Sequence, residues 1–310
     1  MTQISDMKPQ ESIKGCYLCK FKQILKNKNG KDYCTIRLQD RTGAIDGKIW
    51  SFHSCILPFE VDDIVEVEGE TLLYQDNLQL NVNKIQKAEG GYDLKDFIPH
   101  TKKDVSQLEA DLLDLIESVQ ESYIKELLEN IFLEEVTYED FKMHSAGKSV
   151  HHGYLNGLLE HTVAVAKLGL SMAELYENAH KDLVISGCLL HDIGKLRELS
   201  TFPRNDYTDE GQLIGHLVIG SEMIHDAASK IEGFPVEIEM LLKHIVIAHH
   251  GEYEYASPKR PKCIEAMIVH LADFSDSRLK MIDEFLEASN DEPYAGYHKL
   301  LNRNIRRVKL

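Results

Sequence analysis

The hydrophobic pattern of this chain changes its period once, near residue 100, and this change constrains the fold more than any other feature. Residues 13–88 contain short, partly alternating segments rich in Val, Ile, Leu and Tyr, separated by turn sequences such as KNKNGKD, DRTG and YQDN. This pattern predicts β strands. From Asp104 onward, apolar residues recur every three or four positions on an acidic background, which predicts amphipathic helices. We therefore expect a β domain followed by an α domain.

The segments divide the 310 residues into two domains. Five predicted strands lie within residues 13–88, a number that suits a small closed barrel. We expect a barrel domain over residues 1–90, a Gly- and Pro-containing linker over 91–103 and an all-α domain over 104–310. After a first helix from residue 104, further helices are expected around 122–133, 138–143, 156–177, 180–190, 213–231, 235–249 and 261–287.

One stretch of the β region resembles a known nucleic-acid-binding fold. The sequence YCTIRLQDRTGAIDGKIW is similar to the second and third strands of an OB-fold, in which L.D.TG.I....W joins two long strands through a tight turn. OB-folds bind single strands with basic and stacking side chains. The resemblance makes the following residues candidates for nucleic-acid binding: Tyr33, Arg37, Lys48, Trp50 and Phe52. The alternative for Tyr33 and Trp50 is a place in the barrel core.

The charge distribution allows a polyanion to bind locally. The net charge of −16 argues against nonspecific coating of nucleic acid. Residues 14–48, however, carry nine Lys/Arg against three Asp/Glu, and the last stretch, HKLLNRNIRRVKL, carries five Lys/Arg and no acid. The last stretch could cover a neighbouring subunit, bind RNA or form a frayed helix.

The sequence favours a cytoplasmic protein. No apolar run approaches the roughly 20 residues that span a bilayer, so no membrane partner is expected. The polar start MTQISDMKPQESIKG lacks the apolar centre of a signal peptide. The six cysteines have no dense regular spacing and are expected to be reduced thiols.

Most of the 15 histidines lie between His144 and His270, on predicted helices whose other faces are apolar. Burying a carboxylate costs several kcal/mol unless it is paired, so an acidic residue on one of these helices would need charged or hydrogen-bonding partners. The candidates on these helices are His161, His191, Asp192, His216, His249, His250 and Asp273. If these helical faces converge, a metal ion would stabilise the cluster, and mixed imidazole and carboxylate ligation suits manganese, iron, zinc or magnesium.

The order His…His-Asp…His…His-His…Asp resembles the HD superfamily of metal-dependent phosphohydrolases. The resemblance implies that one divalent metal is held by His161, His191, Asp192 and Asp273. The additional histidines favour a second metal, held by His216 with His249, His250 or both. Two metals can clamp both oxygens of an in-line phosphoryl displacement. Asp192 would then bridge the metals and be catalytic.

Several basic residues near the predicted ligands are candidates for phosphate contacts. Lys195 in LLHDIGK is a catalytic candidate that could offset developing charge, and the alternative is a solvated lysine at a helix end. Lys148 and His152 in AGKSVHHGYLNG, and Lys259 and Arg260 in HHGEYEYASPKRPK, are candidates for binding the nucleic acid.

The two halves together resemble the YhaM family of bacterial 3′-5′ exoribonucleases, over about residues 15–305. The motifs that carry the resemblance are HHGYLNGLLEHT, LLHDIGKLREL, YTDEGQLIGH and HHGEYEYASPKRP. The resemblance implies manganese-dependent removal of nucleotides from the 3′ end of single-stranded RNA, with some action on DNA. Two divalent metal ions are expected, manganese first, with iron, zinc, magnesium and cobalt as alternatives.

Two other functions stay open on the sequence alone. HD proteins also hydrolyse small nucleotides, in which case the barrel would be regulatory. A noncatalytic binding protein is the second rival, against which the intact ligand set argues. A homo-oligomer is compatible with the sequence and is not required by it.

Overall fold

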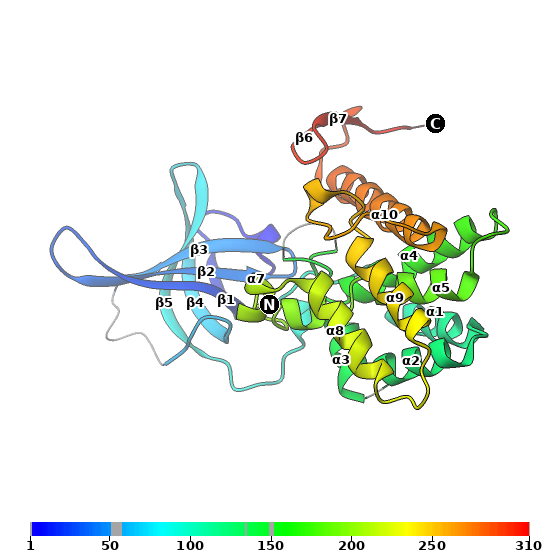
Figure 1. The fold of residues 1–310 in the computed structure, drawn as a ribbon. Coiled ribbons are helices and arrows are strands. Elements are labelled where there is room, and N and C mark those ends of the chain that lie inside the picture. Colours follow the sequence, from blue (N-terminus) through cyan, green and yellow to red (C-terminus); the bar gives the residue numbers. More distant parts are fainter. Residues whose placement is uncertain (1, 51–57, 134, 149–151, 310) are drawn as a thin grey trace. The chain divides into compact units, whose positions relative to one another are not determined.

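The computed structural model describes residues 2–50, 58–133, 135–148 and 152–309. They form two compact units, whose boundary falls between His100 and Thr101 and therefore inside the predicted linker (Figure 1). Part of that linker, Leu94–Asp96, forms a short 3-10 helix, η2, in the first unit. Each unit has its own apolar core.

The first unit is a β barrel. The strands are β1 (Ser12–Lys26), β2 (Asp32–Asp40), β3 (Gly43–Ile49), β4 (Ile64–Tyr74) and β5 (Asn77–Lys87). In the part of the chain that the structure describes, they close in the order β1-β2-β3-β5-β4, with β3 and β5 parallel and the other neighbours antiparallel. The predicted five-stranded OB barrel is thereby confirmed.

The alternation of side chains decides which residues face out of the barrel. Along β2, Cys34, Ile36 and Leu38 are buried in the barrel core. The residues that alternate with them, including Tyr33 and Arg37, point to the opposite face, because successive side chains of a strand alternate. The outer face of β2 and β3 therefore carries polar and aromatic groups.

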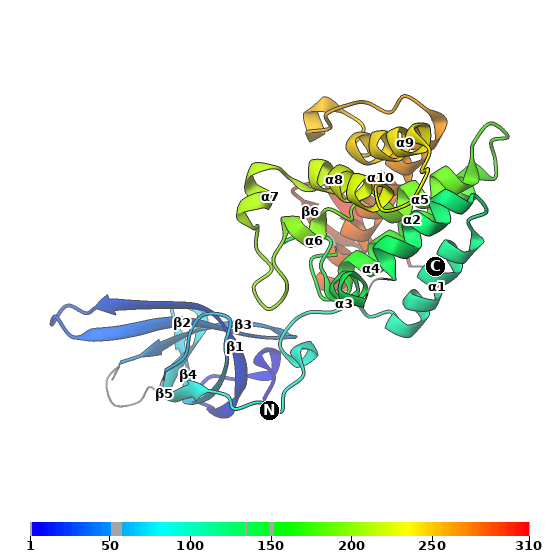
Figure 2. The same ribbon diagram turned by 60° about the horizontal axis from the view of Figure 1, so that its bottom comes forward.

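The second unit is mainly helical, as predicted. Its helices are α1 (Val105–Ser118), α2 (Ser122–Phe132), α3 (Glu135–Met143), α4 (Gly157–Ala173), α5 (Lys181–Leu190), α6 (Lys195–Glu198), α7 (Asp209–Leu213), α8 (His216–Ala228), α9 (Val236–Ala248) and α10 (Ile264–Ala288). Helices α4, α5 and α10 pack against one another, and α9 packs against α5, α8 and α10 (Figure 2). Among the helices of the described residues, none is both long and apolar enough to cross a membrane.

Helix α1 illustrates how the local sequence produces these elements. The Asp104 side chain accepts a hydrogen bond from the backbone N–H of Ser106 and so caps the helix start. Leu108, Leu112 and Leu115 follow at helical spacing and are buried in the core of the second unit.

The helical domain also contains one short β hairpin, which the sequence did not indicate. Two antiparallel strands, β6 (Tyr294–His298) and β7 (Arg303–Arg306), form a hairpin. Its second strand lies in the basic C-terminal stretch, for which a frayed helix was one alternative. The strands have five and four residues and are largely solvent exposed. Strands this short and this exposed carry too little hydrophobic alternation to be recognised in the sequence.

We predict that Ile36→Ala destabilises the barrel by about 2–5 kcal/mol, because it leaves a cavity at a fully buried position. The neighbouring Thr35→Ala is the control, since Thr35 lies on the outer side of β2. Urea unfolding followed by the fluorescence of Trp50, the single tryptophan, measures both. Equal losses of stability in the two variants would contradict the assigned core.

Candidate metal centre and nucleic-acid face

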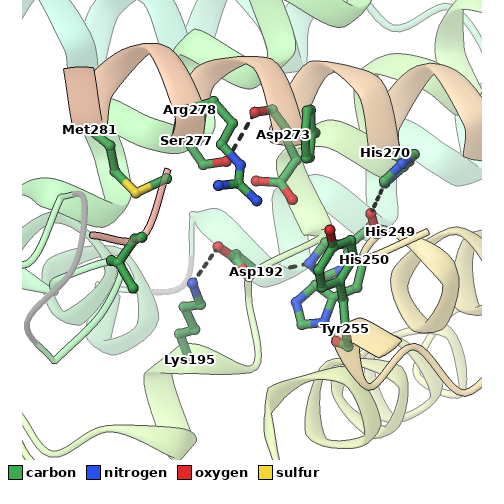
Figure 3. Close-up of a pocket in the computed structure, with 12 residues that line it drawn as sticks. Asp192, Lys195, His249, His250, Tyr255, His270, Asp273, Ser277, Arg278 and Met281 are labelled. Atoms are coloured by element: carbon green, nitrogen blue, oxygen red, sulfur yellow. Dashed lines mark hydrogen bonds and ion pairs between the residues drawn. The ribbon is translucent and has the colours of Figure 1, made fainter. Parts of the chain in front are cut away.

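The seven predicted ligands converge in the second unit from five separate elements. His161 lies in α4, His191 and Asp192 follow α5, and His216 begins α8. The remaining ligands are His249 and His250 after α9 and Asp273 in α10. Four of the seven, Asp192, His249, His250 and Asp273, line a cavity of about 430 Å³ (Figure 3). His191 and Asp192, predicted on a helix, lie just past its end, in the turn between α5 and α6.

The buried carboxylate of Asp192 lies between two groups of imidazoles. Its Oδ2 lies 3.5 Å from His161 Nε2 and 3.4 Å from His191 Nε2. Its Oδ1 lies 3.5 Å from His216 Nε2 and 3.7 Å from His249 Nε2. Asp192 thus offers one oxygen to each group.

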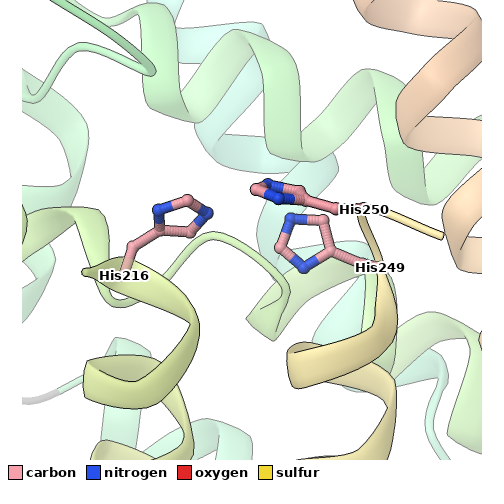
Figure 4. A group of neighbouring side chains, drawn as sticks. All are labelled: His216, His249 and His250. Atoms are coloured by element: carbon pink, nitrogen blue, oxygen red, sulfur yellow. The ribbon is translucent and has the colours of Figure 1, made fainter. Parts of the chain in front are cut away.

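The other ligands complete the two groups. Asp273 Oδ1 lies 3.3 Å from His161 Nε2, on the side of the first group. In the second group, the rings of His216, His249 and His250 face one another with centroids 4.5 to 5.7 Å apart (Figure 4).

Hydrogen bonds at Nδ1 orient the imidazoles. His191, His249 and His250 each donate Nδ1–H to a backbone carbonyl, of Cys188, Val246 and Tyr255, at 2.7 to 2.8 Å. His161 Nδ1 is instead hydrogen-bonded to the carboxylate of Asp276 at 2.7 Å, and His216 Nδ1 to the carboxylate of Glu198 at 2.9 Å. A proton on Nδ1 leaves the lone pair on Nε2, the tautomer that binds a metal.

Two buried atoms indicate that a cation fits the site. Asp192 Oδ1 and His216 Nε2 are buried and find no hydrogen-bond partner among the described residues. Buried polar atoms are nearly always paired, and an orphan can mark the place of an ion. The donor set of imidazole nitrogens and carboxylate oxygens suits a divalent transition metal.

Two glycines allow the ligand-bearing turns to approach one another. A Cβ at Gly194 would lie 2.1 Å from the carbonyl oxygen of His216, so a larger residue would push the start of α8 away from Asp192. Gly251 has φ +82°, and a Cβ there would lie 2.2 Å from the ring of His270. His270 in turn donates Nδ1–H to the carbonyl of His249 at 2.7 Å.

The pKa values of the ligands reflect their partners. Burial would lower the pKa of His161, but Asp273 and Asp276 outweigh it and raise the pKa to about 9. Burial would raise the pKa of Asp192, but Lys195 and His191 hold it well below its usual range. The neighbouring carboxylates thus favour the protonated form of His161, and Lys195 and His191 favour the ionised form of Asp192.

Lys195 lies beside the ligands and is already paired. Its amine lies 2.8 Å from Asp192 Oδ2 and donates to the carbonyl of Ala146 at 2.5 Å. Burial would lower the pKa of this amine, but Asp192 raises it overall, so Lys195 stays protonated. Lys195 is therefore not a freely solvated lysine at a helix end, which was the alternative to a catalytic role.

The structure places the other predicted phosphate contacts in different environments. Lys148 and Arg260 are exposed and form ion pairs with Asp206 and Glu252, and Lys259 is exposed. The residues lining the cavity do not include these three. A role for them in binding nucleic acid stays a prediction.

His152 lies in a buried environment, unlike the other predicted phosphate contacts. Its ring is buried, with Nε2 3.0 Å from Asp276 and Nδ1 3.0 Å from the Tyr154 hydroxyl. The packing of α10 against α4 brings Asp276 between His152 and His161, which the local sequence does not reveal. His152 thus lies behind a metal-ligand candidate, and a role for it in binding nucleic acid stays a prediction.

The barrel presents a basic and aromatic face, which we call the β2–β3 face. Tyr33 and Trp50 stack with ring centroids 5.1 Å apart, and Trp50 is 51% exposed. Lys48 Nζ lies 5.4 Å from the Trp50 ring and 5.1 Å from the exposed ring of Tyr74. Arg37 is exposed beside Asp46. Trp50 is therefore not a core residue, and Phe52 lies outside the described residues.

Several residues that support or line the site were not among the predicted ones. Asp276 and Glu198 hold the two imidazoles that lack a backbone partner. Asp276 follows Asp273 by three positions on α10, a spacing that could have indicated it. The cavity wall also includes residues of α10, the loop after α9 and the C-terminal hairpin: Tyr255, Phe274, Ser277, Arg278, Met281 and Leu300.

We predict that Asp276→Asn weakens divalent-metal binding about 10–100-fold, because the Nδ1 hydrogen bond that orients His161 is altered. The matched control is Asp283→Asn, an exposed carboxylate on the same helix. Calorimetric titration with Mn²⁺ measures both affinities. An Asp276→Asn protein with the affinity of Asp283→Asn would contradict this role.

Comparison with known proteins places this geometry in a family. The HD domain family matches residues 158–277, and the OB-fold nucleic acid binding domain family matches residues 20–88. The 3′-5′ exoribonuclease YhaM of Shouchella clausii (strain KSM-K16) is 34% identical over 282 residues, which cover 89% of this chain and 87% of that protein.

Among solved structures, the second OB-fold domain of replication protein A from Methanococcus maripaludis is 23% identical, with a TM-score of 0.24, covering 30% of this chain and 98% of that one. The OB domain of a Methanosarcina mazei protein is 22% identical, with a TM-score of 0.24, covering 29% and 84%. The identity and coverage of the Shouchella clausii protein, together with the two domain families that match this chain, confirm the predicted resemblance, and the chain belongs to the YhaM family of 3′-5′ exoribonucleases.

Proposed function

We propose that this protein is a divalent-metal-dependent 3′-5′ exonuclease that hydrolyses single-stranded RNA, and DNA as a second substrate, to nucleoside 5′-monophosphates. The observation that carries the proposal is the convergence of five imidazoles and the Asp273 carboxylate around Asp192, in a member of this family. Water adds to the terminal phosphodiester, the bond to the 3′ oxygen of the preceding nucleotide breaks, and that oxygen takes a proton.

The arrangement of Asp192 supports two metal ions, which we propose to be manganese. His161, His191 and Asp273 would hold one with Asp192 Oδ2. His216, His249 and His250 would hold the other with Asp192 Oδ1. When bound, such metals polarise water and the phosphate oxygens.

Lys195 supplies positive charge at the reacting phosphate in this proposal. Its amine is protonated and hydrogen-bonded to Asp192, and it borders the cavity that would receive the phosphate. A fixed cation at this position would stabilise the charge that develops as the phosphodiester bond breaks.

The β2–β3 face supports binding of an unpaired strand without strong sequence preference. Every base has a flat face that can stack on Trp50 and Tyr33, and Lys48 and Arg37 can contact phosphates. A cytoplasmic location and a homo-oligomer stay predictions.

We predict that the wild-type protein with Mn²⁺ shortens a 5′-labelled single-stranded RNA from its 3′ end and that EDTA stops it. Asp192→Ala should abolish the ladder on a sequencing gel, because it removes an oxygen from both ligand groups. Binding of the RNA should stay within a few fold of wild type. Asp283→Asn serves as the unaffected control.

Two results would count against this proposal. A metal-replete, active Asp192→Ala protein would overturn the assigned centre. An intact RNA together with metal-dependent hydrolysis of mononucleotides would favour the small-nucleotide phosphohydrolase with a regulatory barrel.

For the barrel, we predict that Trp50→Ala weakens RNA binding by about 1–3 kcal/mol, the value of one base–aromatic stack. Fluorescence anisotropy in EDTA, which prevents hydrolysis, measures the affinity. The control is Tyr92→Ala, a partly exposed aromatic that packs on Phe97. Equal affinities of the two variants would rule out stacking on Trp50.

A further inference from the structure

The cavity beside the ligands has a second wall, which the metal centre does not use. Helix α10 contributes Phe274, Ser277, Arg278 and Met281, and the connection between β6 and β7 contributes Leu300. Asp273, Ser277 and Met281 are four positions apart, as are Phe274 and Arg278, so all of them share one side of the helix. One rigid helix thus carries both a metal-ligand candidate and this wall.

Arg278 is the unpaired cation of this wall. Its side chain points into the cavity on the side of Asp273 and Asp192 (Figure 3), and its guanidinium lies 5.0 Å from the Phe274 ring. Across the described ranges, no carboxylate pairs with it and no hydrogen bond engages it. By contrast, the amine of Lys195 is bound to Asp192.

An unpaired guanidinium that points into a cavity beside metal-ligand candidates can bind a phosphate. Arginine presents a planar fork of N–H donors that matches phosphate oxygens, and it is weakly hydrated. Lys280, two positions further along α10, differs because it is paired with the buried Glu160 at 3.1 Å. Arg278 therefore stands apart from its neighbour as a group available to a ligand.

Apolar groups border the same cavity and are left open to solvent. Phe274 is 41% exposed and Leu300 is 63% exposed, and Met281 is half-buried. Beside a cluster of charged groups, such surfaces suit a ligand with both a flat apolar part and an anionic part. A nucleotide has both.

We propose that this wall is the subsite for the 3′-terminal nucleotide, an inference that rests on the proposed exonuclease function. Arg278 binds the phosphate that links the last two nucleotides, next to the metal ligands. Phe274, Met281 and Leu300 contact the terminal base. Because the contacts to the base are apolar, the subsite accepts different bases.

The first test measures kcat/KM on a single-stranded RNA for Arg278→Ala and Arg278→Lys. We expect a loss of about 10–100-fold for Arg278→Ala, as for a hydrogen bond to a charged group, and partial recovery in Arg278→Lys. Bound Mn²⁺, measured by elemental analysis, should be unchanged. The control is Lys181→Ala, which removes an exposed cation from the start of α5, outside the cavity.

The second test separates the base from the phosphate. Phe274→Ala should lower kcat/KM about tenfold on an RNA with an ordinary 3′ end, the size expected for one base–aromatic contact. It should change little on an RNA whose 3′-terminal residue is abasic. Inhibition by adenosine 5′-monophosphate should weaken in both Arg278→Ala and Phe274→Ala, whereas inhibition by inorganic phosphate should weaken only in Arg278→Ala.

The outcomes distinguish a failure of the proposed subsite from a failure of the proposed exonuclease function. A wild-type protein that does not shorten RNA would overturn the proposed function and the subsite with it. An active wild type with Arg278→Ala within twofold of it, or with loss of bound Mn²⁺ in Arg278→Ala, would overturn the phosphate contact alone. A Phe274→Ala loss of equal size on ordinary and abasic ends would overturn the base contact.

Discussion

The structure of the second unit depends on one buried carboxylate. Asp192 is almost fully enclosed, and a carboxylate in that position requires positive or hydrogen-bonding partners on every side. Lys195 supplies one partner, and the Nε2 atoms of four imidazoles surround the two oxygens at 3.4 to 3.7 Å. These imidazoles come from helices far apart in the sequence, so the packing of the helices and the geometry around Asp192 require one another.

The ends of helices supply much of this geometry. The last carbonyls of a helix lack intrahelical partners, and His191 and His249 each donate Nδ1–H to the carbonyl three residues earlier. A single hydrogen bond therefore satisfies the helix end, fixes the tautomer and aims Nε2 at the centre. Gly194 then lets the start of α8 approach closely enough to add His216. Backbone requirements and ligand requirements are met by the same residues.

The two units contribute different chemistry. Stacking on the β2–β3 face tolerates any base, and a divalent metal centre acts on the phosphodiester, which is common to all nucleotides. The proposed subsite for the 3′-terminal nucleotide would also accept different bases, because its contacts to the base are apolar. In the proposed function, this combination would allow degradation of RNA of many sequences from one end, because neither stacking nor the phosphate contacts depend on the identity of a base.

The sequence by itself determined the period of each segment, and hence the barrel, most of the helices and the set of candidate ligands. Strand alternation and helical spacing are local, and the order of His and Asp residues is carried by the chain itself. Only the tertiary structure decided that Trp50 is exposed, that His152 lies behind His161 and that Lys195 is bound to Asp192. It also decided the partners that no local pattern encodes: Asp276 orients His161 across 115 positions of sequence, and Leu300 reaches the cavity through a hairpin too short to be recognised. Such contacts depend on how helices pack, and packing is a property of the whole core rather than of any window of sequence.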